Sequence, residues 1–273
     1  MKLHVISWLF HASIASAAVF GREGAARQLQ HRQNTAATEQ MPHFQNATYP
    51  KNWAVVMYNS FDAIDVFGPI DVLFYLSMSK QLNLNFVAES MDPLWMRPTS
   101  QAFNKQGSRF AASINPTHTF DKPPRDIDVL LVPGGPGMRH ANISRSAIDF
   151  IRKTYPRVKY LLTVCTGAGL AASAGVLDGK RATTNKASWK DIVAMGPKVK
   201  WVSPAKWTID GNIWTSSGVT SGLDLIFEFV DVMYSKELSL QIQGSIEYQR
   251  AADACDDPWA AFHKVPPTGD CRA

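Results

Sequence analysis

The chain has 273 residues, of which 45% are hydrophobic and 19% are charged, and its formal net charge is +5. The basic residues are scattered, with no lysine run and no arginine–aromatic pattern, which argues against a nucleic-acid-binding surface. The seven histidines are dispersed and form no zinc-type spacing with the three cysteines. This composition predicts a single globular domain with a full-sized core.

The N-terminal residues predict a targeting signal followed by a polar leader. Lys2, the largely apolar stretch Val5–Phe20 and the small residues Ala15-Ser16-Ala17 are typical of a secretory signal peptide over residues 1–17. Residues 18–50 are polar and lack a sustained apolar period, so we expect a flexible leader without a core of its own. We therefore expect a secreted protein that has no membrane attachment once the signal is removed.

Two short patterns agree with secretion. Asn46 and Asn142 each begin an acceptor sequon, which predicts N-glycosylation at one or both. Cys255 and Cys271 both lie in the polar tail of residues 253–273, and we expect them to form a disulfide. Cys165 would then be the odd, free thiol.

From residue 51 to residue 252 the sequence alternates between strand-like apolar runs and segments with helical periodicity, followed by the tail. The expected strands are 53–58, 84–88, 127–132, 160–164, 181–184, 201–202, 207–210 and 212–216. The expected helices are 65–78, 146–154, 167–172, 188–195, 222–233 and 238–251. This alternation predicts an α/β fold, a three-layer sandwich with a mostly parallel central sheet and right-handed crossovers.

Cys165 ends an apolar run and is followed at once by the small residues 167–172. A side chain at such a strand-to-helix corner sits on a sharp turn at the carboxyl end of the sheet, as in a nucleophile elbow. Backbone N–H groups and the helix dipole there favour a thiolate, which predicts a lowered pKa of roughly 3.5–7.5. The alternative, a small buried core cysteine, is also common. The corner favours a reactive thiol.

Two more segments follow predicted strands. Asp65 begins the predicted helix 65–78, and Gly134-Gly135 comes directly after the predicted strand 127–132. Ligands of parallel sheets bind beyond the carboxyl ends of the strands, so one crevice could hold Asp65, Gly135 and Cys165. Paired glycines let the backbone turn tightly and point N–H groups into a crevice, although an ordinary Pro-Gly turn has the same sequence.

Three motifs together resemble a known family. Asp65-Val-Phe-Gly68-Pro69, Val132-Pro-Gly134-Gly135 and Val164-Cys165-Thr166-Gly167 are similar to motifs of the ThiJ/PfpI superfamily. That resemblance implies a class I glutamine-amidotransferase-like, flavodoxin-like fold over residues 52–250. Within the superfamily, an Asp before Gly-Pro combined with Cys-Thr-Gly at the elbow most resembles the isonitrile (isocyanide) hydratases.

The resemblance implies roles for four residues. The Cys165 thiolate attacks an isonitrile carbon to give a thioimidate, and Asp65 handles protons and orients water. Thr166 adds a hydroxyl and an N–H beside the sulfur, and Gly135 contributes to an oxyanion-type pocket. A lyase of this type releases an N-substituted formamide from a small-molecule substrate, without a metal or an organic cofactor.

One departure from the superfamily leaves alternatives open. Many members carry a histidine where this chain has Asn185, and an asparagine cannot act as a general base. This disfavours, without removing, a glyoxalase or deglycase that acts on reactive carbonyls. A non-enzymatic redox sensor or ligand-binding domain is the other alternative. Superfamily members are commonly homodimers, but the sequence leaves the assembly open, as it does a role in detoxification or in secondary metabolism.

Overall fold

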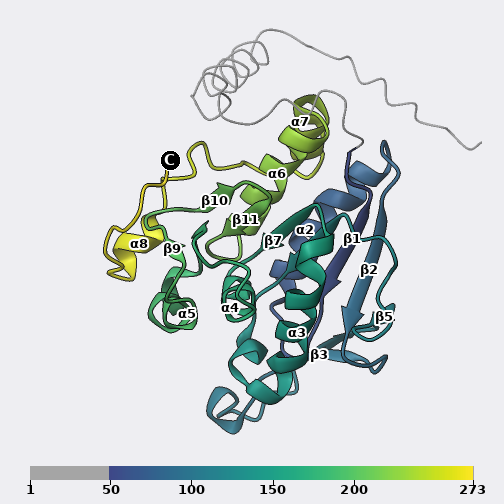
Figure 1. Cartoon of the computed structure of the whole chain (residues 1–273), viewed down its shortest axis with the longest axis vertical. Helices are drawn as coiled ribbons and strands as arrows, with labels where there is room; N and C mark the ends of the chain where they lie inside the picture. Colours follow the sequence, from purple (N-terminus) through teal and green to yellow (C-terminus); the bar gives the residue numbers. More distant parts are fainter. Residues whose placement is uncertain (1–48, 273) are drawn as a thin grey trace, which may run out of the picture. The chain divides into compact units, whose positions relative to one another are not determined.

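A computed structural model of the chain describes residues 49–272 (Figure 1). The signal peptide predicted over residues 1–17, the leader up to residue 48 and the sequon at Asn46 lie outside the described residues. The second sequon lies inside them, and Asn142 is exposed in the first turn of a helix.

A seven-stranded sheet forms the centre of the described structure, in the order β10-β11-β7-β6-β1-β2-β5. Its strands are β1 (Asn52–Val56), β2 (Asn83–Ala88), β5 (His118–Thr119), β6 (Val129–Val132), β7 (Tyr160–Thr163), β10 (Trp207–Asp210) and β11 (Ile213–Ser216). Neighbouring strands are parallel except for the β10–β11 pair at one edge, which is antiparallel. The central strand β6 is buried throughout and reads as a continuous apolar run, because both faces of a parallel sheet are covered.

Helices cover the sheet in two groups (Figure 1). The longer helices are α2 (Ala63–Ser77), α3 (Ala141–Thr154), α4 (Gly167–Ser173), α5 (Trp189–Met195), α6 (Ser221–Met233) and α7 (Lys236–Ser245). In one group α2, α6 and α7 contact one another, and in the other α4 contacts both α3 and α5. The structure therefore confirms the mixed α/β fold with a mostly parallel central sheet.

Several elements differ from the sequence-based prediction. The sequence did not indicate the antiparallel pair β3 (Leu94–Met96) and β4 (Ala112–Ile114), the short helix α8 (Pro258–Phe262) or the 3-10 turns. These turns are η1 (Gln101–Phe103), η2 (Pro136–Arg139), η3 (Tyr155–Arg157) and η4 (Lys186–Ser188). Helix α7 ends at Ser245 rather than at residue 251, since Glu247 has a left-handed backbone with φ 54° that a helix cannot contain.

The predicted strand over 181–184 does not join the main sheet. Its first half is β8 (Arg181–Ala182), which pairs in parallel with β9 (Lys200–Trp201) in a separate two-stranded sheet. The backbone N–H groups that face the main sheet bind side chains instead of a neighbouring backbone. Arg181 N donates to Asp210 Oδ2 at 2.9 Å, and Thr183 N donates to Thr215 Oγ1 at 2.8 Å.

The C-terminal residues fold back onto the domain. A disulfide joins Cys255 to Cys271, with their Cα atoms 5.6 Å apart, while Cys165 is a free buried cysteine. Ser203 and Thr268 exchange two backbone hydrogen bonds of 2.8 and 2.7 Å. Within residues 49–272, no helix is both long enough and apolar enough to cross a membrane.

We predict that peptide mapping under non-reducing conditions finds Cys255 linked to Cys271 and Cys165 unpaired. Replacing both tail cysteines by serine should lower the free energy of unfolding by about 3 kcal/mol, because a closed loop of this length restricts the unfolded chain. Urea denaturation measures the change. Two free thiols in the tail of correctly folded protein would contradict the prediction.

Candidate active site

Cys165 occupies the corner between β7 and α4. Its φ of 57° places a non-glycine residue in the left-handed region, and the side chain is 6% exposed. Val164 N donates to Val132 O at 3.0 Å, and Gly167 N donates to Val164 O at 2.9 Å, which closes the turn. A Cβ on Gly167 would stand 2.2 Å from Val132 O, so the corner requires glycine there. This is the strained strand-to-helix turn of a nucleophile elbow.

Asp65 lies in the first turn of α2 and is completely buried. Its Oδ2 accepts a hydrogen bond from Gly134 N at 2.9 Å. Burial raises the pKa of Asp65 to about 8 and the nearby Asp62 adds to the rise, while hydrogen bonds from Gly134 and Cys165 oppose it. At neutral pH this carboxyl therefore holds a proton in contact with Cys165.

The glycine loop after β6 ties Asp65 to the elbow. A Cβ on Gly134 would meet Thr166 Oγ1 at 2.6 Å and Asp65 Oδ2 at 2.8 Å, so only glycine fits between them. Gly135 has φ 140°, and its N–H donates to Thr166 Oγ1 at 3.1 Å. This engagement differs from the sequence-based expectation that the Gly135 N–H points into the crevice as an oxyanion donor. The structure instead makes Gly135 the residue that holds the Thr166 hydroxyl.

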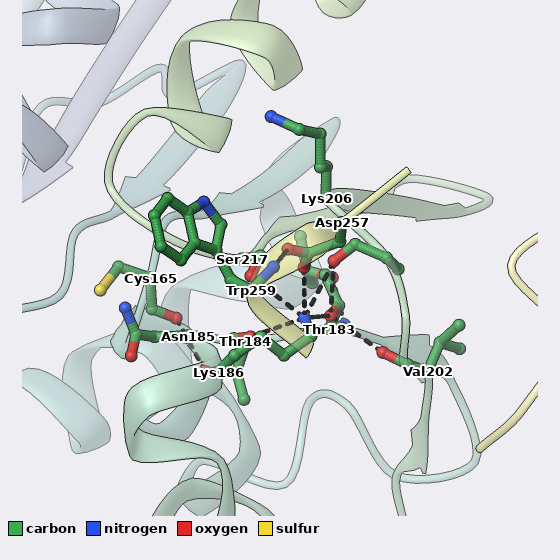
Figure 2. A network of polar contacts seen from close by, with 12 residues as sticks. Cys165, Thr183, Thr184, Asn185, Lys186, Val202, Lys206, Ser217, Asp257 and Trp259 are labelled. Carbon is green, nitrogen blue, oxygen red and sulfur yellow. Dashed lines mark hydrogen bonds and ion pairs between the residues drawn. The ribbon is translucent and has the colours of Figure 1, made fainter. Parts of the chain in front are cut away.

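Asn185 is a hydrogen-bond donor to the Cys165 sulfur. Its Oδ1 accepts from Ser188 N at 3.0 Å, which directs the amide nitrogen the other way, and the side-chain amide bonds to the Cys165 sulfur. Figure 2 shows this nitrogen on the sulfur side of Cys165. The neighbouring Thr184 Oγ1 donates to Cys165 O at 2.9 Å. From the sequence, Asn185 meant only that a general base is absent at this position. The structure shows that its side chain also has a positive role, as a hydrogen-bond donor to the Cys165 sulfur.

The environment of Cys165 differs from the low-pKa thiolate that the corner alone predicts. Burial raises the pKa of the Cys165 thiol well above its usual range, and the carboxyls of Asp65 and Asp62 raise it further. The Thr166 N–H and the Asn185 amide act in the opposite direction. The thiol and the Asp65 carboxyl thus form a coupled pair in which both groups favour the protonated form.

Tyr58 also belongs to the site, although the sequence indicated only a buried strand there. Its hydroxyl donates to Pro133 O at 2.8 Å, in the glycine loop. Burial raises the pKa of Tyr58, and the charges of Asp65 and Cys165 raise it further, so the hydroxyl remains neutral. No pattern in the sequence separates this tyrosine from an ordinary core residue.

Four tryptophans of the C-terminal half, at positions 189, 201, 207 and 214, are apolar side chains of the kind that can line a substrate pocket. Trp214 is fully buried in the core, and Trp207 is 6% exposed. Trp189 and Trp201 line a cavity of about 680 Å³ together with Arg181, Pro266 and other residues of α5, β9 and the C-terminal segment. Neither Cys165 nor Asp65 lines that cavity. Core packing, the common fate of tryptophan, accounts for these side chains better than contact with a substrate at Cys165.

We predict that Asp65→Asn raises stability at neutral pH. The folded state binds a proton at Asp65 up to about pH 8, whereas an unfolded Asp releases it near pH 4, so wild-type stability falls as the pH rises between these values. The asparagine variant lacks this loss, so its advantage should grow by up to about 1.4 kcal/mol per pH unit.

Urea denaturation between pH 4.5 and 8.5 measures this difference. Asp71→Asn, at an exposed position of the same helix, is the matched control and should follow the wild type. A difference between Asp65→Asn and wild type that does not change with pH would contradict the assignment.

Comparison with known proteins places this site in a family. The DJ-1/PfpI family model matches residues 51–232. The isonitrile hydratase of Pseudomonas putida is 28% identical over 198 residues, which cover 72% of this chain and 78% of that protein. A deglycase of Pyrococcus horikoshii is 35% identical over 106 residues, covering 38% of this chain and 61% of that protein.

Further matches agree on the domain. The HTH-type transcriptional regulator GbdR of Pseudomonas aeruginosa is 30% identical over 146 residues, which are 52% of this chain and 38% of the regulator. A solved ThiJ/PfpI family protein from Pseudomonas syringae shares the fold, with a TM-score of 0.61, 24% identity and coverage of 85% of this chain and 93% of that chain. Since the family model spans well over half of the sequence, the chain belongs to the DJ-1/PfpI family.

Proposed function

We propose that the protein is a cysteine-dependent hydratase that converts isonitriles to N-substituted formamides. The observation that carries the proposal is the contact between Cys165 and the buried carboxyl of Asp65, whose pKa of about 8 leaves it protonated at neutral pH. Hydration of an isonitrile needs a nucleophile that attacks carbon and an acid that protonates that same carbon. The pair supplies both from adjacent side chains.

The reaction needs one water and two covalent steps. The Cys165 sulfur forms a bond to the terminal isonitrile carbon as Asp65 gives its proton to that carbon and takes up the thiol proton, which gives a thioimidate, R–N=CH–S–Cys. Water then adds to this carbon, while Asp65 gives a proton to the nitrogen and takes one from the water. The C–S bond breaks as the proton of the new hydroxyl group passes through Asp65 to the sulfur, so R–NH–CHO leaves and the thiol is restored.

Neighbouring groups stabilise the negative charge that develops on the Cys165 sulfur as it attacks the isonitrile and again as the C–S bond breaks. The Thr166 N–H and the Asn185 amide bond to the Cys165 sulfur, and such donors are most effective in a buried site, where water cannot compete. Gly134 N–H holds the Asp65 carboxyl, and Gly135 N–H holds the Thr166 hydroxyl. Every group in the scheme comes from the chain or from water.

The relatives support a cysteine-based enzyme but include more than one reaction. A match to an isonitrile hydratase extends over 72% of the chain, whereas the match to a deglycase extends over 38%. The amide at position 185 also favours the hydratase, because a carbonyl reaction that relies on a Cys–His pair would lack its base here. The deglycase reaction is therefore the alternative that the assay must separate.

We predict that Cys165→Ala abolishes hydration of an isonitrile and that Asp65→Asn lowers the rate by about 10²–10⁴-fold, the usual effect of losing a proton-transfer group. Thr166→Val should fall between these variants and wild type, since it keeps the backbone N–H but leaves the Gly135 N–H without its acceptor. Initial rates on a panel of small isonitriles, with formamide detected by mass spectrometry, measure the effects.

Circular dichroism and a parallel assay with methylglyoxal are the controls. Near-normal hydration by folded Cys165→Ala would show that the nucleophile is elsewhere. Activity on methylglyoxal alone would favour the deglycase alternative. Peroxide-sensitive ligand binding without turnover would favour a sensor.

We also propose that the protein acts as a homodimer through α2. Four large apolar side chains follow one face of this helix and its end and are 45–66% exposed, namely Ile64, Phe67, Phe74 and Met78. An apolar stripe of this kind on a soluble protein is typical of an interaction surface. The family often forms dimers, and a second copy is the partner we expect.

We predict that Phe74→Glu shifts the protein from dimer to monomer in size-exclusion chromatography with light scattering, because it places a charge in the apolar stripe. Phe110→Glu changes another exposed phenylalanine outside α2 and is the control. Equal masses for wild type and both variants would argue against this surface.

Secretion is a further proposal, supported by the N-terminal sequence pattern and by the paired tail cysteines, since disulfides persist in oxidising compartments. We predict that the intact mass of protein recovered from culture medium corresponds to a chain beginning at Ala18, with added glycan mass at Asn46, Asn142 or both. A cytosolic chain that retains Met1–Ala17 would contradict it.

A further inference from the structure

A buried ammonium group, that of Lys186, lies two residues after Thr184, whose hydroxyl contacts the Cys165 carbonyl. Lys186 is 3% exposed, and its Nζ lies among five oxygens (Figure 2). The oxygens are Thr183 Oγ1 (2.9 Å), Thr184 O (3.1 Å), Ala205 O (2.9 Å), Ser217 Oγ (3.0 Å) and Asp257 Oδ2 (3.1 Å). An ammonium has only three N–H groups, so the arrangement is saturated.

Asp257 is the only carboxylate among these five oxygens. Its side chain is fully buried, and it pairs with Lys186 by charge rather than through a well-aligned hydrogen bond. Burial lowers the pKa of Lys186, and Asp257 opposes that change. A buried charge needs a partner of opposite charge, because removing one member leaves the other without compensation.

The carboxylate comes from outside the part of the chain that matches the family model. That match ends at residue 232, whereas Asp257 lies in the C-terminal strap, residues 253–272. The Cys255–Cys271 disulfide closes the strap, and Lys206 N donates to Ala254 O at 2.6 Å just before Asp257. The other oxygen of Asp257 accepts from Trp259 N at 3.1 Å and caps α8. Asp257 is thus held in place from both sides.

The other end of this network contacts the nucleophile. Lys186 binds the carbonyl of Thr184, and the Thr184 hydroxyl donates to Cys165 O. Asn185, between Thr184 and Lys186, donates its amide to the Cys165 sulfur. Polar contacts therefore run from Asp257 in the strap through Lys186 and Thr184 to the Cys165 carbonyl (Figure 2), and Asn185 adds the interaction with the sulfur.

We infer that Lys186 and Asp257 are positioning residues, which fix the 183–186 loop so that the Asn185 amide meets the Cys165 sulfur. The inference rests on the proposed function only in treating Cys165 as the nucleophile. It assigns the C-terminal strap a role in the active site, although the strap supplies no group that touches the substrate.

The test measures how fast iodoacetamide alkylates Cys165 as a function of pH. The alkylation midpoint is the pH at which the rate reaches half of its highest value. In Asp257→Asn the loop loses its anchor, so this midpoint should move upward, on the order of one pH unit, as the Asn185 hydrogen bond to the thiolate is lost. A direct charge effect has the opposite sign, since removing a negative charge favours the thiolate. Asp178→Asn, which breaks an exposed ion pair with Lys198, is the matched control and should leave the midpoint unchanged.

A second variant separates positioning from stability. Lys186→Met combined with Asp257→Leu removes both buried charges, so it should unfold at a higher urea concentration than either single variant. If the residues position the loop, the alkylation midpoint of the double variant stays shifted upward, because nothing holds the Thr184 carbonyl. If they serve stability alone, the midpoint returns to the wild-type value, and the inference is wrong.

Kinetics on an isonitrile add an independent readout. We expect kcat of folded Asp257→Asn to fall roughly 10–100-fold, while KM changes much less, because a displaced donor affects the reacting sulfur more than substrate binding. Wild type that fails to hydrate isonitriles, together with an upward shift of the midpoint, would reject the proposed function and keep the inference. A folded Asp257→Asn with an unchanged or lowered midpoint would overturn the inference.

Discussion

The left-handed backbone at Cys165 is the constraint on which the rest of the site depends. A non-glycine residue with φ 57° costs on the order of 1–3 kcal/mol, so the surrounding structure must hold it. It does so by close approach: Gly167 lies against the carbonyl of Val132, and Gly134 lies against Thr166 and Asp65. Neither glycine could carry a side chain. The same contacts that hold the strained turn bring the carboxyl of α2 to the sulfur.

Burial determines the chemistry of the pair formed by Asp65 and Cys165. In water Asp65 would be charged and Cys165 neutral at pH 7, with little interaction between them. In their buried surroundings the low dielectric raises the pKa of both groups, so a protonated carboxyl lies beside a protonated thiol at neutral pH. In the proposed hydration, a neutral Asp65 does not repel the charge that develops on sulfur, and it gives its proton to carbon as the sulfur attacks. The elbow alone, with its N–H groups and helix end, would have produced a different reagent, a free thiolate.

The sequence predicted the longer strands and helices in their order, but not β3, β4, β5 or α8. It also predicted that Asp65 meets Cys165, because both follow apolar strands whose ends coincide in a parallel sheet. The sequence did not correctly predict where the Gly135 N–H points or whether the pKa of Cys165 is raised or lowered. The Gly135 N–H binds Thr166, and the pKa of Cys165 is raised, because these depend on which groups lie within about 3 Å after folding. The strands over 181–184 and 201–202 were predicted, but their pairing as β8–β9 outside the main sheet was not, since the side chain of Thr215 takes the place of a main-sheet partner.

The role of Asn185, which stands where many superfamily members have histidine, depends on the next residue, Lys186. An imidazole at that position could exchange protons with sulfur, and it would then compete with Asp65 for the same role. An amide donates without titrating, so the proton stays with the Asp65–Cys165 pair, but the amide is useful only where its hydrogen bond is held in place. Lys186 supplies that hold through the loop carbonyl, and a buried ammonium in turn requires a carboxylate, which comes from the C-terminal strap. The strap and the amide thus form one arrangement, in which the carboxylate of the strap pairs with the lysine that holds the loop carrying the Asn185 donor beside Cys165.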